Sequence, residues 1–113
     1  MDDDVKMGSA GAGISPSDMF NFYLSQEQNN VLESIRALEI RKEKNLDPRP
    51  ARVYLNVCLK ILILRMDPLL RDSGKNRDEL LGRIHNLKED GVIEFYNELA
   101  KIISRKTNKR TIL

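Results

Sequence analysis

The sequence predicts a single all-α domain, a compact bundle of about four helices around one very apolar helix. Two observations support this fold class. The 113 residues are 41% hydrophobic and 32% charged, which is typical of a globular chain rather than a disordered one. Residues 53–66 are apolar on nearly every helical face, which indicates a helix buried on most sides. At this length about two-thirds of the unfolded surface can be buried, so a core needs no disulfide.

The first predicted element is a long helix from about Pro16 to Lys44, preceded by a Gly-rich acidic tail over residues 1–15. Ser15, Pro16 and Asp18 favour a helix start, since they supply a hydroxyl cap, a first-turn proline and an acid near the positive end of the dipole. A short heptad seam runs along this helix at Leu24, Gln28, Val31, Ile35 and Leu38. Such a seam has two interpretations: packing within its own domain, or a coiled-coil contact with another chain.

The second predicted helix runs from Pro50 to about Met66, after a break at residues 45–50, because residues that precede proline avoid the helical conformation. Asp67-Pro68 should end it and start one short helical turn through Arg71. Leu59, Met66 and the run 61–64 cannot all face the three other helices. We therefore expect either close wrapping of this helix or a partner that covers one flank.

Two further helices are predicted over residues 77–89 and 92–105, separated by Gly91, and residues 107–113 are expected to form a basic and polar tail. The folded domain would then span residues 16–106. Aromatic residues cluster at 20–23 and at 95–96. Because aromatic side chains favour contact with one another, we expect these two clusters to meet and close the bundle.

Charge is balanced over the body and opposed at the ends. Residues 1–18 carry four acidic side chains and one basic, whereas residues 100–113 carry five basic side chains and no acid. The basic set is a candidate for contact with nucleic-acid phosphates, and it would give salt-sensitive binding with little sequence preference. It comprises Lys101, Arg105, Lys106, Lys109 and Arg110.

No motif predicts catalysis, a metal or a cofactor. His85 is the single histidine and Cys58 the single cysteine, and the latter lies within the apolar run, where a thiol usually packs as a small hydrophobe. Residues 83–94 resemble the end of a winged-helix recognition helix, but residues 95–103 have helical rather than strand periodicity, which argues against a wing. In a plain helix-turn-helix the last helix would read DNA, yet Glu94 and Glu98 lie near its start.

These observations favour a non-enzymatic protein that docks to other protein chains, as a homo-oligomer or within a larger assembly such as a virus particle. The seam at 24–38 is the predicted protein interface. The alternative is a small nucleic-acid-associated regulator that acts through the basic C-terminal set. We expect no cofactor, no small-molecule substrate and no membrane contact. The acidic start and the charges within the apolar run favour a cytoplasmic location, or one inside a virus particle.

Overall fold

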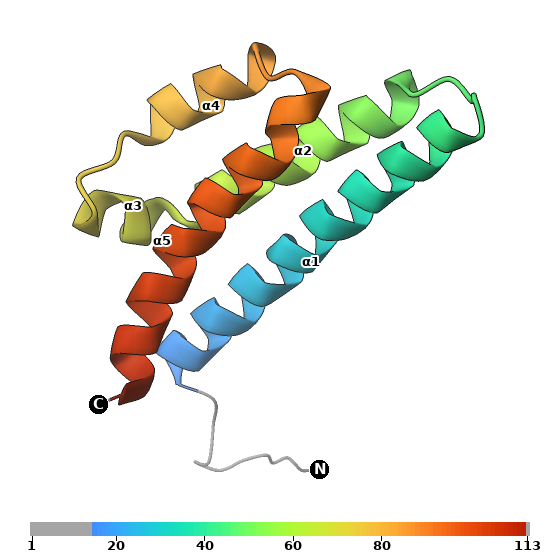
Figure 1. Ribbon diagram of the computed structural model, residues 1–113. Coiled ribbons are helices and arrows are strands. Elements are labelled where there is room, and N and C mark those ends of the chain that lie inside the picture. Colours follow the sequence, from blue (N-terminus) through green and yellow to red (C-terminus); the bar gives the residue numbers. More distant parts are fainter. Residues whose placement is uncertain (1–14, 113) are drawn as a thin grey trace, which may run out of the picture.

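The computed structural model describes residues 15–112, with side chains through Arg105, and it confirms the all-α fold class. Its helices are α1 (Pro16–Glu43), α2 (Arg49–Arg65), α3 (Asp67–Asp72), α4 (Arg77–His85) and α5 (Val92–Ile112), with a short 3-10 turn, η1, at Glu89–Gly91. Figure 1 shows α1 and α2 as a long hairpin, with α3, α4 and α5 on one side of it. Residues 1–14 of the predicted N-terminal tail lie outside the described residues.

Local side chains fix both ends of the α1–α2 hairpin. Ser15 Oγ accepts the Asp18 backbone N–H at 3.1 Å, and Pro16 occupies the first turn, so α1 begins where the sequence predicts. At the other end Asn45 takes a left-handed φ of 57°, and Arg41 Nε donates to the Asp47 carbonyl at 2.7 Å. Arg49 Nε in turn lies 3.0 Å from Asp47 Oδ1. The chain therefore reverses within five residues and returns along α1.

The core lies where α5 crosses the hairpin (Figure 1). Helix α2 supplies its centre, since Leu55, Leu59, Leu62 and Ile63 are fully buried. Burial of each such side chain contributes about 1.5–3 kcal/mol, so this one helix provides a large part of the stability. The other helices contribute Leu24, Val31, Leu38, Leu69, Leu70, Leu80, Ile84, Val92, Phe95, Tyr96, Leu99, Ile102 and Ile103.

Two predicted helix ends differ from the structure. Helix α4 stops at His85 rather than at Glu89, because the Leu87 carbonyl accepts a hydrogen bond from the Arg52 guanidinium and residues 86–88 leave the helical path. Helix α5 continues to Ile112 instead of stopping at Arg105. Residues 104–112 contain neither glycine nor proline, so no residue there breaks a helix. The predicted tail therefore has helical backbone through residue 112.

The two aromatic clusters do not meet as expected. The rings of Phe22 and Tyr23 pack edge to face with centroids 5.7 Å apart, whereas Phe95 lies under the Arg83 guanidinium at 4.9 Å. Tyr96 reaches α1 at Gln28, whose Nε2 donates to the phenol oxygen at 3.3 Å. The start of α1 adjoins the C-terminal end of α5 (Figure 1), while Phe95 and Tyr96 belong to the other end.

No helix in the described part of the chain combines the length and the apolarity needed to cross a membrane.

Candidate protein-interaction surface

The predicted interface seam on α1 faces the interior of the chain. Leu24, Val31 and Leu38 are buried in the core, and Ile35 packs against it half-buried. The remaining position, Gln28, bonds to Tyr96 of α5. Of the two interpretations of this heptad pattern, the structure shows packing within the chain's own domain.

A second apolar surface remains open on α2. We call it the outer stripe and define it as Val53, Tyr54, Val57, Ile61 and Leu64, whose side chains are between 39% and 62% exposed. The last four are spaced by three, four and three residues, which places them on one helical face about 15 Å long. This face is opposite the one that carries Leu55, Leu59 and Leu62. An exposed patch of large apolar side chains is typical of an interaction site.

Polar groups of α1 border the outer stripe along one side. The pKa of the Tyr54 phenol is raised above its ordinary value, chiefly because the ionisable Cys58 thiol lies beside it, with a further contribution from the Glu33 carboxylate. Near the other end of the stripe, the Arg65 guanidinium lies 5.0 Å above the Tyr23 ring, and its Nε is 3.7 Å from Glu27 Oε2. An apolar centre with a polar rim is the usual anatomy of a protein–protein interface.

Contacts of α2 with its neighbours hold the outer stripe in place. Ser34 Oγ and Cys58 Sγ lie 3.4 Å apart within the buried α1–α2 contact. Where α2 faces the turn after α4, Arg52 donates to the Leu87 carbonyl and lies 3.7 Å from Glu89 Oε2. The stripe is therefore presented by a helix already fixed by its inner face, which reduces the entropy lost when a partner binds.

Glu89 joins three elements at one end of the molecule. Its carboxylate lies 2.8 Å from Lys42 Nζ of α1 and also faces Arg52 of α2. The hydrogen bond from Lys42 is the main cause that lowers the pKa of Glu89, and the charges of Lys42 and Arg52 lower it further. A recess of about 230 Å³ lies beside this cluster, and its walls include Ile35, Leu38, Leu55 and Ile93.

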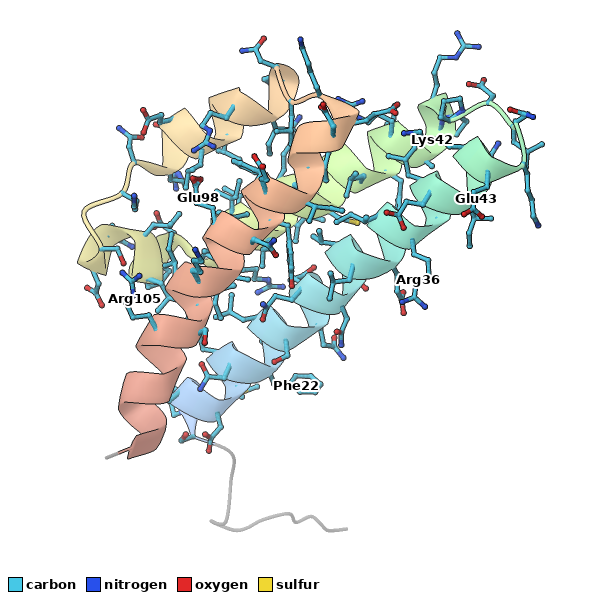
Figure 2. The ribbon with its side chains drawn as sticks, in the orientation of Figure 1. Phe22, Arg36, Lys42, Glu43, Glu98 and Arg105 are labelled. Atoms are coloured by element: carbon cyan, nitrogen blue, oxygen red, sulfur yellow. The ribbon has the colours of Figure 1, made fainter. Side chains whose placement is uncertain are left out.

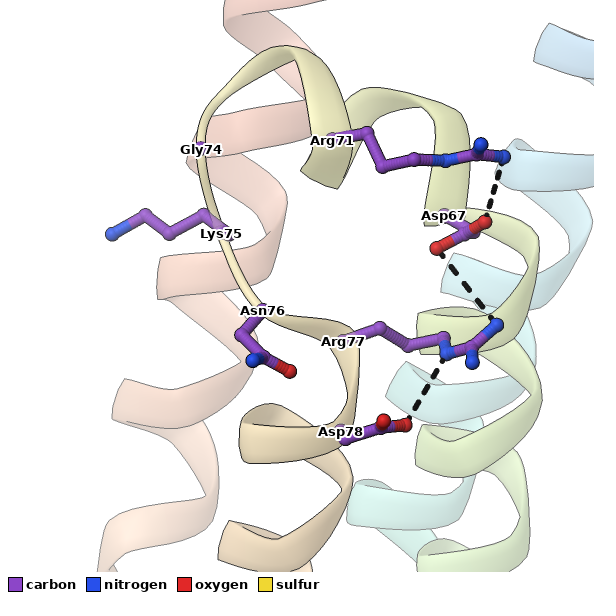
Figure 3. Close-up of a pocket in the computed structure, with 7 residues that line it drawn as sticks. All are labelled: Asp67, Arg71, Gly74, Lys75, Asn76, Arg77 and Asp78. Carbon is purple, nitrogen blue, oxygen red and sulfur yellow. Dashed lines mark ion pairs between the residues drawn. The ribbon is translucent and has the colours of Figure 1, made fainter.

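The larger depression in Figure 3 is polar and lies at the α3–α4 loop. Asp67 lies on its wall, 2.9 Å from the nearest Arg71 nitrogen and 3.9 Å from Arg77 Nη1, and Arg77 also contacts Asp78 at 3.5 Å. Gly74 has a φ of 71°, a left-handed conformation that favours glycine. These ion pairs pin the loop between the two helices, and we assign the depression a structural role.

The basic residues of the nucleic-acid alternative lie along α5. Lys101 and Arg105 are exposed, and Arg105 projects away from α1 (Figure 2). Lys106, Lys109 and Arg110 belong to the helical backbone of α5, but their side chains lie outside the described part of the structure. The structure therefore brings two of the five predicted residues onto one open helix surface.

Among the described residues, no group of three or more His, Cys, Asp or Glu side chains is placed to hold a metal ion. His85 is exposed at the end of α4, and the Cys58 thiol is buried in the α1–α2 contact. Comparison of the chain with protein-family models, with curated proteins and with solved structures gave no match.

Proposed function

We propose that this protein is a non-enzymatic assembly protein that docks to other protein chains through the outer stripe of α2. The observation that carries the proposal is the division of α2 into two apolar faces. The inner face is fully buried, while the opposite one leaves Tyr54, Val57 and Leu64 about half exposed. Because each of these side chains is already about half covered, a partner that buries one would add roughly half of the 1.5–3 kcal/mol that full burial contributes. A partner that covers the stripe would recover that free energy.

The character of the stripe supports a protein partner rather than a small ligand. It is a convex helix face, whereas ligand sites are concave and enclose most of the ligand surface. It contains a tyrosine flanked by aliphatic residues, and tyrosine is enriched at the centres of protein interfaces. The sequence predicts a protein interface on the α1 seam. The proposal keeps protein docking as the function but places the interface on α2, where the apolar side chains are exposed.

The test is the effect of acidic substitutions in the stripe on complex formation. We expect Val57→Asp combined with Ile61→Asp to abolish the complexes in which the native protein participates, because a charge would have to be buried in the apolar centre. Light scattering coupled to size-exclusion chromatography measures the masses, and circular dichroism checks that the variant is folded.

The matched control is Leu32→Asp. Leu32 is 46% exposed, similar to Val57, but it lies on α1 among Asn29, Glu33 and Arg36. This variant should keep the wild-type complexes. If the double variant is folded and forms every complex that the wild type forms, the proposal is wrong.

The nucleic-acid alternative has one supporting observation, the exposure of Lys101 and Arg105 on a helix whose backbone continues through the other three basic residues. Lys109→Glu with Arg110→Glu should then weaken retention on DNA or RNA, and so should higher salt, because phosphate contacts release counterions. Retention that changes with neither would exclude this alternative. The same variant should leave protein complexes unchanged if docking proceeds through the outer stripe.

A further inference from the structure

We infer that the outer stripe takes a second copy of this chain, packed antiparallel about a two-fold axis that passes between Val57 and Ile61. This inference rests on the proposed function and specifies the partner. Three features support it: the spacing of the stripe, the charge distribution along α1, and the area that the stripe offers.

The spacing of the residues in the outer stripe is the same when the chain direction is reversed. Tyr54, Val57, Ile61 and Leu64 are separated by three, four and three residues, so the pattern is the same in both chain directions. An antiparallel copy of α2 therefore places Tyr54 against Leu64 of the second copy, and Val57 against its Ile61. A two-fold interface requires this kind of self-complementarity, since the same patch serves both subunits.

The charge distribution along α1 selects the antiparallel direction. Residues 15–35 carry three acids, Asp18, Glu27 and Glu33, and no basic residue. Residues 36–44 carry four basic residues and two acids. Because α1 borders the stripe, antiparallel pairing lays the acidic half of each α1 across the basic half of the other. Parallel pairing about a two-fold axis would place the two α1 helices on opposite sides of the paired α2 helices, so this attraction would be lost.

The area of the stripe fits a reversible dimer. Five large apolar side chains, each two-fifths to three-fifths exposed, form a patch in the range of about 300–600 Å² that the largest patch on a typical monomer covers. Two such patches together bury on the order of 1,000 Å², near the lower limit for a specific interface. We therefore expect a monomer–dimer equilibrium that depends on protein concentration, rather than an obligate dimer.

The decisive experiment is charge complementation across the two-fold axis. In the antiparallel register, Val57→Lys in one copy faces position 61 of the other. Val57→Lys alone and Ile61→Glu alone should each weaken self-association at least tenfold, because each buries two unpaired charges. An equimolar mixture of the two variants should restore a heterodimer, since one Lys–Glu pair then forms and the second contact keeps its native residues. Sedimentation velocity over about 1 µM to 1 mM measures the dimer fraction.

A second mixture, Val57→Lys with Val57→Glu, is the matched control. It should stay monomeric in the antiparallel register, whereas parallel pairing would restore this mixture and not the first one. That reversed result would overturn the inference, and so would wild-type protein that stays monomeric up to the highest concentration. Restoration in the first mixture also shows that both variants are folded.

Failure of this inference can be separated from failure of the proposed function. If the pure chain is monomeric but enters a complex with a different protein, and Val57→Asp with Ile61→Asp abolishes that complex, the second copy is wrong and the docking surface stands. If the pure chain dimerises and the stripe variants leave the dimer unchanged, both are wrong.

Discussion

The two faces of α2 differ in what covers them, although their side chains are chemically alike. Leu59 and Leu62 on the inner face are fully buried by the chain's own helices, whereas Val57 and Leu64 on the outer face keep about half of their surface in water. Both faces are built mainly from aliphatic residues, and Tyr54 is the aromatic exception on the outer face. The apolar character of a helix face therefore does not determine what covers that face. The position of the other helices decides which face is buried in the fold and which stays exposed.

The largest expected difference between the faces is in the free energy of unfolding. Leu59→Ala should lower it by about 2–5 kcal/mol, because a buried leucine leaves a cavity that the core fills only partly. Leu64→Ala should lower it by less than about 1 kcal/mol when measured on the monomer, since half of that side chain is already in water. Urea unfolding followed by circular dichroism at low protein concentration measures both. Equal losses for the two variants would contradict the division of α2 into two faces.

A smaller effect is expected at Arg52, which ties the inner face of α2 to the turn after α4. Arg52→Met should lower the free energy of unfolding by about 1–3 kcal/mol, because the Leu87 carbonyl loses its donor and Glu89 loses a neighbouring cation. The control is Arg49→Met, whose side chain is 87% exposed and pairs with Asp47 at the surface. An exposed ion pair contributes about 0–1 kcal/mol. If both variants lose the same amount, the proposed anchoring by Arg52 is incorrect.

The smallest effect is a pH dependence from Glu89. Its folded-state pKa lies below the ordinary value of 4.5, chiefly because of the hydrogen bond from Lys42. The folded state therefore holds the proton less tightly than the unfolded state, so this group stabilises the fold above about pH 4.5, and the contribution is lost as the pH falls through the folded-state pKa. Glu89→Gln should be less stable than wild type at neutral pH, with the difference shrinking below pH 4.5. The urea midpoint, measured at several pH values, reports this. A difference that stays constant down to acidic pH would argue against a role for the carboxylate charge.

Helix α1 was predictable from the sequence because its ends are local, and so was the start of α2. Ser15 and Pro16 define the start of α1. Asp47-Pro48 separates α1 from α2, and α2 begins at Arg49, one residue before the predicted start at Pro50. The end of α4 was not predictable, since it depends on a hydrogen bond between Arg52 and Leu87, which are 35 residues apart. No sequence window contains both partners of that bond.

The exposed apolar face on which the proposal rests was predictable only in part, for a different reason. A heptad seam has the same spacing whether it faces the core or another chain, so Leu24, Val31 and Leu38 could not be assigned to either by pattern. On α2 the apolar residues cover nearly every face, and no periodicity remains to separate inner from outer positions. The sequence left two possibilities for α2: close wrapping by the other helices, or one flank covered by a partner. The placement of α4 and α5 then leaves one flank, the outer stripe, exposed.

The palindromic spacing of the outer stripe has a consequence for how this chain can change over generations. In an antiparallel dimer, position 57 touches position 61 of the other subunit, and both are encoded by the same gene. A single substitution is therefore introduced twice in each dimer, on both sides of the axis at once. Drift at position 57 should be accompanied by compensating drift at position 61, and drift at position 54 by drift at 64, whereas Leu55 and Leu59 should vary with residues of α1 and α5 instead.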